Sequence, residues 1–288
     1  MPLVTLAEVL QAADSGGYAV GAFNCNNMEI VQAIINAARS EGAPVIIQAS
    51  QGAIKYAGLE YITSLVRTAA AGTDIPVVLH LDHGTDFEQI LRCLRAGFTS
   101  VMIDGSKFPL EENMALTRRV VAIAHVMGAS VEGELGRIGG TEEQISVSAR
   151  EATMTDPEEA RRFAATTGVD ALAVAIGTAH GRYKGTPELD FDRLAAIDRL
   201  VPTPIVLHGS SGVPDDAIRR AVELGVRKIN IDTDIRVAFV EATRQALAAN
   251  PDEIDPRKVL GPAREAATAV IRHKIQVFGS AGRIKSSG

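Results

Sequence analysis

Tryptophan is absent from this sequence of 288 residues, which also contains only four Tyr and eight Phe. Proteins that bind single-stranded nucleic acid by stacking its bases need exposed aromatic side chains. Basic residues are also in deficit, with 29 Lys and Arg against 35 Asp and Glu and a net charge of −6. Phosphate backbones and anionic membranes attract basic surfaces. We therefore expect neither a nucleic-acid nor a membrane partner.

Cysteine is scarce, since only Cys25 and Cys93 are present. Two cysteines give no disulfide framework and suit a reducing compartment. The first residues lack the basic stretch and apolar core of a signal peptide, and no run of apolar residues is long enough to span a membrane. We expect a cytoplasmic protein.

Short apolar runs rich in β-branched residues alternate with amphipathic helical patterns along the whole chain. Several runs are almost continuous in Val, Ile and Leu, as in parallel strands that are buried on both faces. The expected strands cover residues 18–23, 44–49, 76–81, 99–103, 130–134, 171–176, 204–207 and 227–231.

Eight strand–helix units predict an α/β fold of the (β/α)8 or TIM-barrel type, in a single domain over residues 1–288. A doubly wound open sheet is the alternative, but the chain has no GxGxxG and no GxxxxGK[ST] motif. The stretch 135–155, with three glycines, is expected to form a mobile lid after the fifth strand, or else a passive insertion. Prolines between 251 and 262 predict a loop before an extra C-terminal helix over 263–277.

Three Thr-x-x-Glu sequences predict helix starts, because their side chains can form a capping box. They begin at Thr5, Thr85 and Thr155.

The end of every expected strand carries a polar group, and the active sites of such barrels lie at the C-terminal ends of the strands. This is the main reason to expect an enzyme. In chain order these residues are Asn24, Ser50, Asp82 with His83, Asp104, Glu134, His180, His208, and Asn230 with Asp232.

Histidines follow three of these strands, and each is followed by Gly, at His83, His180 and His208. A single histidine is more often structural, but three converging imidazoles with an open fourth position describe a catalytic Zn²⁺ site. Co²⁺ and Fe²⁺ also suit imidazole ligands. Asp104 and Glu134 could support these ligands, form another metal position, or bond to neighbouring loops.

Two glycine-rich loops follow the sixth and seventh expected strands, at residues 181–185 and 209–212. Their backbone N–H groups and hydroxyls suit phosphate oxygens, and the late strands of a barrel commonly hold the phosphate. Gly-Ser-Ser-Gly alone is a weak signal, and beside a histidine ligand it is more specific.

With these residues and motifs, the sequence resembles the class II, metal-dependent fructose-bisphosphate aldolases and their relatives, the tagatose-bisphosphate aldolases. The resemblance covers essentially the whole chain. Its motifs lie at 81–83, 101–106, 132–136 with 139–140, 175–181, 208–212 and 230–234.

The resemblance implies that His83, His180 and His208 bind catalytic Zn²⁺ and that Asp82 is the acid/base residue. Asp104 and Glu134 would form a secondary metal position, and Glu142 in the lid would transfer a proton. Its substrate-binding segments correspond to Gly181, Gly209, Ser210, Ser211, Asn230, Ile231, Asp232 and Thr233, with Asn24 and Ser50 in support. A monovalent cation, Na⁺ or K⁺, near the phosphate is implied for some members.

The implied reaction is the reversible cleavage of fructose 1,6-bisphosphate to dihydroxyacetone phosphate and glyceraldehyde 3-phosphate, in glycolysis and gluconeogenesis. Family members are homodimers or homotetramers and borrow an arginine from the neighbouring subunit for the far phosphate. Arg236 and Arg264 are candidates, or simple surface charges. A Schiff base on a lysine, with Lys107, Lys184 or Lys228 nearest the strand ends, is the competing mechanism.

Three other functions remain open. Tagatose 1,6-bisphosphate differs from the fructose substrate at one carbon, and Asp232 and Ser211 favour the fructose enzyme. A zinc hydrolase on the same barrel would also use three histidines, but its closely spaced His-x-His pair is missing, since His80 and His83 are three apart. A non-catalytic sugar-phosphate binder would not need Asp82 together with the metal set.

Overall fold

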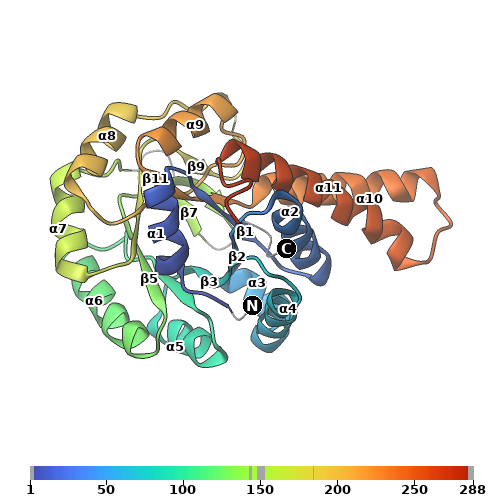
Figure 1. The fold of residues 1–288 in the computed structure, drawn as a ribbon, viewed down its shortest axis with the longest axis horizontal. Helices are drawn as coiled ribbons and strands as arrows, with labels where there is room; N and C mark the ends of the chain where they lie inside the picture. The colour runs from blue at the N-terminus through green and yellow to red at the C-terminus, as the bar shows by residue number, and fades with distance from the viewer. Residues whose placement is uncertain (1–2, 143–144, 148–152, 184, 285–288) are drawn as a thin grey trace.

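A closed barrel of parallel strands forms the centre of the computed structural model, which describes residues 3–142, 145–147, 153–183 and 185–284 (Figure 1). The strands follow one another around the barrel in the order β1, β11, β10, β8, β5, β4, β3, β2, and each is parallel to its neighbours. Their bounds are β1 Val20–Asn24, β2 Val45–Ser50, β3 Val77–Gly84, β4 Ser100–Ile103, β5 Ser130–Leu135, β8 Ala171–Val174, β10 Ile205–Leu207 and β11 Val226–Ile231.

Helices surround this barrel on the outside, which confirms the predicted (β/α)8 fold (Figure 1). They are α2 Met28–Glu41, α3 Gln51–Ala57, α4 Leu59–Ala71, α5 Phe87–Ala96, α6 Leu110–Val126, α7 Pro157–Thr167, α8 Phe191–Leu200 and α9 Asp215–Glu223. All eight expected barrel strands are present, with ends that shift by a few residues.

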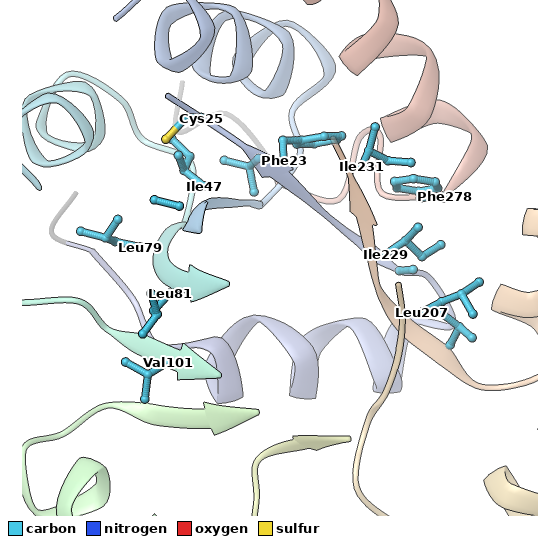
Figure 2. Close-up of a cluster of buried hydrophobic side chains, with 14 of the residues drawn as sticks. Phe23, Cys25, Ile47, Leu79, Leu81, Val101, Leu207, Ile229, Ile231 and Phe278 are labelled. Carbon is cyan, nitrogen blue, oxygen red and sulfur yellow. The ribbon is translucent and has the colours of Figure 1, made fainter. Parts of the chain in front are cut away.

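Alternate side chains of the strands point outward and fill the space between strands and helices, because successive strand residues face opposite sides. Figure 2 shows this layer, with Ile47, Leu79, Val101 and Ile229 from four different strands. Phe278, just after the last helix, packs into the same layer and is fully buried. This outward layer is the main hydrophobic core.

The helix α1, Leu6–Gly16, covers the end of the barrel where the strands begin. Its buried Leu6 and Leu10 form a second apolar cluster with inward-facing residues of the strands, among them Val78 and Val206. Thr5 and Glu8 form the predicted capping box at its start. The barrel is therefore filled with side chains at this end.

The other two predicted capping boxes are wrong, because an aspartate one residue later takes the N-cap position in each case. Asp86 caps α5 and Asp156 caps α7. The displaced threonines bond elsewhere: Thr85 accepts a hydrogen bond from Gln51, while Thr155 accepts one from the Ala175 N–H and donates one to a backbone carbonyl.

Two long helices, α10 Thr233–Ala249 and α11 Pro256–Val277, lie side by side and project beyond the barrel (Figure 1). The helix α11 begins seven residues before the predicted start, because Asp255 caps it and Pro256 occupies its first turn, where no N–H is needed. Pro262 lies inside the helix, so the loop expected there was wrong. Within the described part of the chain, none of the helices has the length and apolarity that a membrane crossing requires.

The stretch after β5 forms a small separate sheet together with β9, in the order β7, β6, β9. Its strands are β6 Gly139–Glu142, β7 Ile145–Val147 and β9 Ala179–His180. A backbone bridge between Arg137 and Thr153 closes the base of this stretch. Its expected movement as a lid stays a prediction.

Candidate active site

The end of β3 brings Asp82 and His83 into the mouth of the barrel together, although neighbours in a regular strand face opposite sides. His83 has a φ of +47°, the only positive φ of a non-glycine residue in the described segments. The register between β3 and β4 shifts at this point. Gln51 donates hydrogen bonds to the His83 carbonyl and the Thr85 hydroxyl, at 2.8 and 2.9 Å. These bonds hold the left-handed turn in place.

The imidazoles of His83, His180 and His208 converge, and one nitrogen of each lies within 4.8 Å of the others. His208 Nδ1 and His83 Nε2 are 3.0 Å apart. All three side chains are buried. His180 does not follow its barrel strand directly, as the sequence suggested, because β8 ends at Val174 and the short strand β9 carries His180.

Asp82 is held by two amide groups, one on each carboxylate oxygen. Asn24 Nδ2 donates to Asp82 Oδ2 at 2.8 Å, and Asn230 Nδ2 donates to Asp82 Oδ1 at 3.2 Å. Gln48 donates to Asn24 Oδ1 at 2.6 Å and so orients that amide. The carboxylate is 1% exposed and fixed in both position and orientation.

Asp104 and Glu134 lie beside His83 and form a second group of possible ligands with it. His83 Nδ1 is 3.4 Å from Asp104 Oδ2 and 4.0 Å from Glu134 Oε2. Burial alone would raise the pKa of Asp104, but hydrogen bonds from His83 and Ser106 lower it below the usual range. Burial and the nearby Asp104 charge raise the pKa of Glu134 well above its usual value. The two carboxyl groups therefore differ in their preferred protonation.

A layer of buried polar side chains lies inside the barrel below these residues, and most of its members were not predicted as site residues. Glu132 is fully buried and contacts His208, Lys228 and His80. Burial would raise its pKa, but the Lys228 charge and the His208 hydrogen bond lower it below the usual range. Strand alternation was the sequence signal for this layer, because residues two positions apart in a strand face the same side. Two positions before a candidate site residue stand Gln48, His80, Glu132 and Lys228.

The phosphate-binding candidates form connected loops at the ends of β9, β10 and β11. Tyr183 Oη accepts the Ala179 N–H and donates to the Gly209 carbonyl, both at 2.7 Å. Ser211 Oγ accepts N–H groups from Asp232 and Asp234 at 3.3 Å. These bonds tie the three loops together.

A cavity of ≈ 830 Å³ opens beside these loops. It is lined by Gly181, Ser211 and Thr233, and it extends along α10 and α11. The clustered imidazoles of His83, His180 and His208 are not among its described lining residues. It therefore borders the loop end of the site.

Other candidates have structural contacts of their own. Ser50 lies beside Asp82 in the register of β2 and β3, and its hydroxyl caps α3. Ser210 is buried and donates to the Leu207 carbonyl. Ile231 is buried in the outward apolar layer, so its side chain faces away from the loops. Glu142 ends β6, and its side chain lies outside what the structure describes.

The two candidate arginines occupy different places. Arg236 Nε is 2.7 Å from Asp232 Oδ1, one helical turn earlier, which puts it next to the strand-end loops. Arg264, on α11, donates to Gln32 Oε1 and contacts Glu265. Within one chain these contacts keep Arg264 on the helices rather than among the imidazoles.

Comparison with known proteins identifies the family. Residues 4–283 match the family described as fructose-bisphosphate aldolase class-II. The chain is 49% identical to a fructose-bisphosphate aldolase from Thermus caldophilus, over 98% of this chain and 99% of that one.

Two solved structures are also similar over nearly the full length of both chains. A putative fructose-1,6-bisphosphate aldolase from Coccidioides immitis superposes with a TM-score of 0.90 at 31% identity, covering 97% of each chain. The YdjI aldolase from Escherichia coli K12 has a TM-score of 0.85 at 32% identity, covering 98% of this chain and 100% of that one. The resemblance drawn from the motifs is thereby confirmed: the chain belongs to the class II fructose-bisphosphate aldolase family.

Proposed function

We propose that this protein is a Zn²⁺-dependent lyase that reversibly cleaves fructose 1,6-bisphosphate into dihydroxyacetone phosphate and glyceraldehyde 3-phosphate. The observation that carries the proposal is the convergence of three buried imidazoles beside a carboxylate that two amides hold. Family membership and the 49% identical relative named for this activity support it. We further propose that residues 1–288 form a single domain that works in the cytoplasm.

The donor set fits a catalytic Zn²⁺ ion, which prefers three protein ligands and an open position. Burial lowers the pKa of His208, against the opposing effect of Glu132, so the ring is kept neutral as a ligand must be. His83, His180 and His208 would hold the ion, with Asp104 and Glu134 as a secondary position that shares His83. When bound, Zn²⁺ supplies Lewis acidity toward the ketose carbonyl.

Asp82 would take the proton from the hydroxyl next to the breaking carbon–carbon bond and return it in the condensation direction. A general base acts from a fixed place within hydrogen-bond reach of its proton. The amides of Asn24 and Asn230 keep both oxygens of Asp82 in that place. Glu142, at the end of β6, would transfer the second proton.

The loops that follow β9, β10 and β11 would bind the nearer phosphate through their N–H groups and hydroxyls, with a Na⁺ or K⁺ ion in support. Gly181, Ser211 and Thr233 offer such groups at the border of the cavity. The farther phosphate would bind Arg236, or Arg264 from a neighbouring subunit in a homodimer or homotetramer.

The lysine mechanism has little support in the described residues. Lys228 is fully buried and paired with Glu132, where a substrate carbonyl has no access. Lys107 lies over the Phe108 ring on the surface side of its loop. Lys184 lies outside the described residues.

The test is cleavage of fructose and tagatose 1,6-bisphosphates in parallel, with and without EDTA and with Zn²⁺ added back. We expect turnover that is lost with chelator, restored by metal and faster for the fructose sugar. Turnover that resists EDTA would refute the metal mechanism.

The same assay separates the other candidate functions. Preference for tagatose 1,6-bisphosphate would keep the mechanism and refute the role assigned to Asp232. Metal binding without cleavage of either sugar would indicate a binder or a hydrolase of another substrate.

A further inference from the structure

An ion pair is buried in the middle of the barrel, where charge is costly. Lys228 Nζ on β11 is 2.8 Å from Glu132 Oε2 on β5, and both side chains are 0% exposed. Buried pairs are weak contributors to stability, because desolvation of the two charges opposes their attraction. This pair therefore calls for an explanation other than stability.

The second oxygen of Glu132 faces a proposed metal ligand. Glu132 Oε1 is 2.8 Å from His208 Nε2. A neutral imidazole carries one N–H and one lone pair, so the nitrogen that donates to the carboxylate cannot also bind a metal. The lone pair is then on His208 Nδ1, the atom that lies 3.0 Å from His83 Nε2 inside the cluster.

Lys228 fixes the carboxylate that makes this choice. Its ammonium holds Oε2, which leaves Oε1 directed at His208. His80 lies against the same carboxylate, with Nε2 3.6 Å from Oε2, and is itself held by the Ser100 hydroxyl at 2.8 Å from Nδ1. Glu132 is thus confined by Lys228 on β11, by His80 on β3 and by His208 just after β10.

We propose that Glu132 and Lys228 are positioning residues for the metal site: Glu132 accepts the His208 Nε2 proton, and Lys228 holds Glu132 in the orientation that does so. This inference rests on the proposed function, because it concerns how a proposed ligand presents its lone pair. Partners that orient a ligating histidine typically change metal affinity by about 10- to 100-fold when removed.

The test compares two double variants that both lack the buried charges. K228M/E132Q keeps an acceptor for His208, whereas K228M/E132L removes it. Zn²⁺ affinity is measured by competition with a chromophoric chelator, and the stability of the metal-free proteins by urea unfolding. We expect similar urea midpoints for both, and a Zn²⁺ affinity about 10- to 100-fold weaker for the Leu variant than for the Gln variant.

A single variant tests Lys228 itself. K228M keeps the acceptor but loses the anchor, and we expect its Zn²⁺ affinity to fall as well. The matched control is R227M on the same strand, which removes the surface pair of Arg227 with Asp14. Its Zn²⁺ affinity should equal that of the wild type.

A metal-free readout keeps this inference separate from the proposed function. Nitrogen-15 NMR of the histidine rings should show His208 as the Nε2–H tautomer in the wild type and a changed signal in K228M/E132L. An unchanged ring signal, or equal Zn²⁺ affinity in both double variants or in K228M and the wild type, would overturn the inference alone. Wild-type protein that binds no Zn²⁺ would overturn the proposed function as well.

Discussion

Asp82 and His83 are adjacent in the chain, and the proposed mechanism gives them different tasks. A regular strand would separate their side chains onto opposite faces of the barrel wall. The left-handed backbone at His83 avoids this, at a cost of about 1–3 kcal/mol for a non-glycine residue. The two hydrogen bonds from Gln51 help to offset that cost.

The role of Asp82 predicts a loss of turnover without loss of metal. Asp82→Asn keeps the shape of the side chain but removes the base, so we expect kcat to fall by about 10²- to 10⁴-fold. Bound Zn²⁺, measured by atomic emission, should stay at one ion per chain because the three imidazoles are unchanged.

Asp86→Asn is the matched control for that variant. Asp86 lies in the same loop and caps α5, a position where Asn serves about as well as Asp. Its kcat should stay near that of the wild type. Near-normal kcat in Asp82→Asn would contradict the assignment of the base.

The site residues that could be predicted are those at the ends of strands, because the fold gathers these ends at one face. The buried layer below them could not be ranked from sequence. The pairing of Lys228 with Glu132 could not be predicted, because the two residues are far apart in the chain and meet only in the closed barrel. Asn24 and Asn230 were predicted as strand-end residues, but their convergence on Asp82 could not be, because it depends on three separate strands.

At the scale of elements, one proposed metal ligand belongs to the small sheet of β7, β6 and β9 rather than to the barrel. His180 is on β9, which pairs with β6 through Gly139 and Gly140. A Cβ built on Gly140 would lie 2.2 Å from the His180 carbonyl oxygen, and Gly140 has a φ of +99°. The close approach of these two strands therefore requires glycine.

Gly140→Ala should thus weaken metal binding from outside the ligand set. The added methyl group cannot fit against the backbone of His180, so β6 and β9 must separate and move the imidazole. We expect a Zn²⁺ affinity at least about tenfold lower, as for loss of a ligand-supporting contact. Competition with a chelator measures it.

Gly128→Ala provides the comparison for backbone strain alone. Gly128 also has a positive φ of +73°, but a Cβ there meets nothing within 4 Å. It should lower the urea midpoint slightly and leave Zn²⁺ affinity unchanged. If both variants bind Zn²⁺ like the wild type, the coupling of β6 to His180 is refuted.

The eight barrel strands were predictable because short apolar runs alternate regularly with helical patterns along the chain. Their ends depended on contacts between segments that are distant in sequence. Thr155 matches a capping box, but its hydroxyl bonds to Ala175 instead, and Asp156 takes over the cap. Pro262 reads as a helix breaker, but α11 continues through it and buries Ala263, Ala267, Ile271 and Ile275.

For the whole molecule, the three imidazoles join segments from three parts of the chain, at residues 83, 180 and 208. A metal that binds only the folded state stabilises it by about 2.7 kcal/mol when its free concentration is 100 times Kd. We expect EDTA to lower the Tm by several degrees and Zn²⁺ to restore it.

His208→Ala tests whether that stabilisation comes from the imidazole cluster. With one ligand missing, the Tm should no longer respond to EDTA or to added Zn²⁺. Differential scanning calorimetry on both proteins measures the effect. A wild-type Tm that ignores EDTA would argue against a resident metal.

The helix α1 has one more consequence. Its apolar side chains fill the barrel where the strands begin, so molecules cannot pass through the barrel from one end to the other. A substrate and both of its fragments must use the same doorway, at the opposite end. A product that has not yet dissociated blocks the entry of substrate. Either triose phosphate should therefore inhibit the enzyme by competing with the substrate.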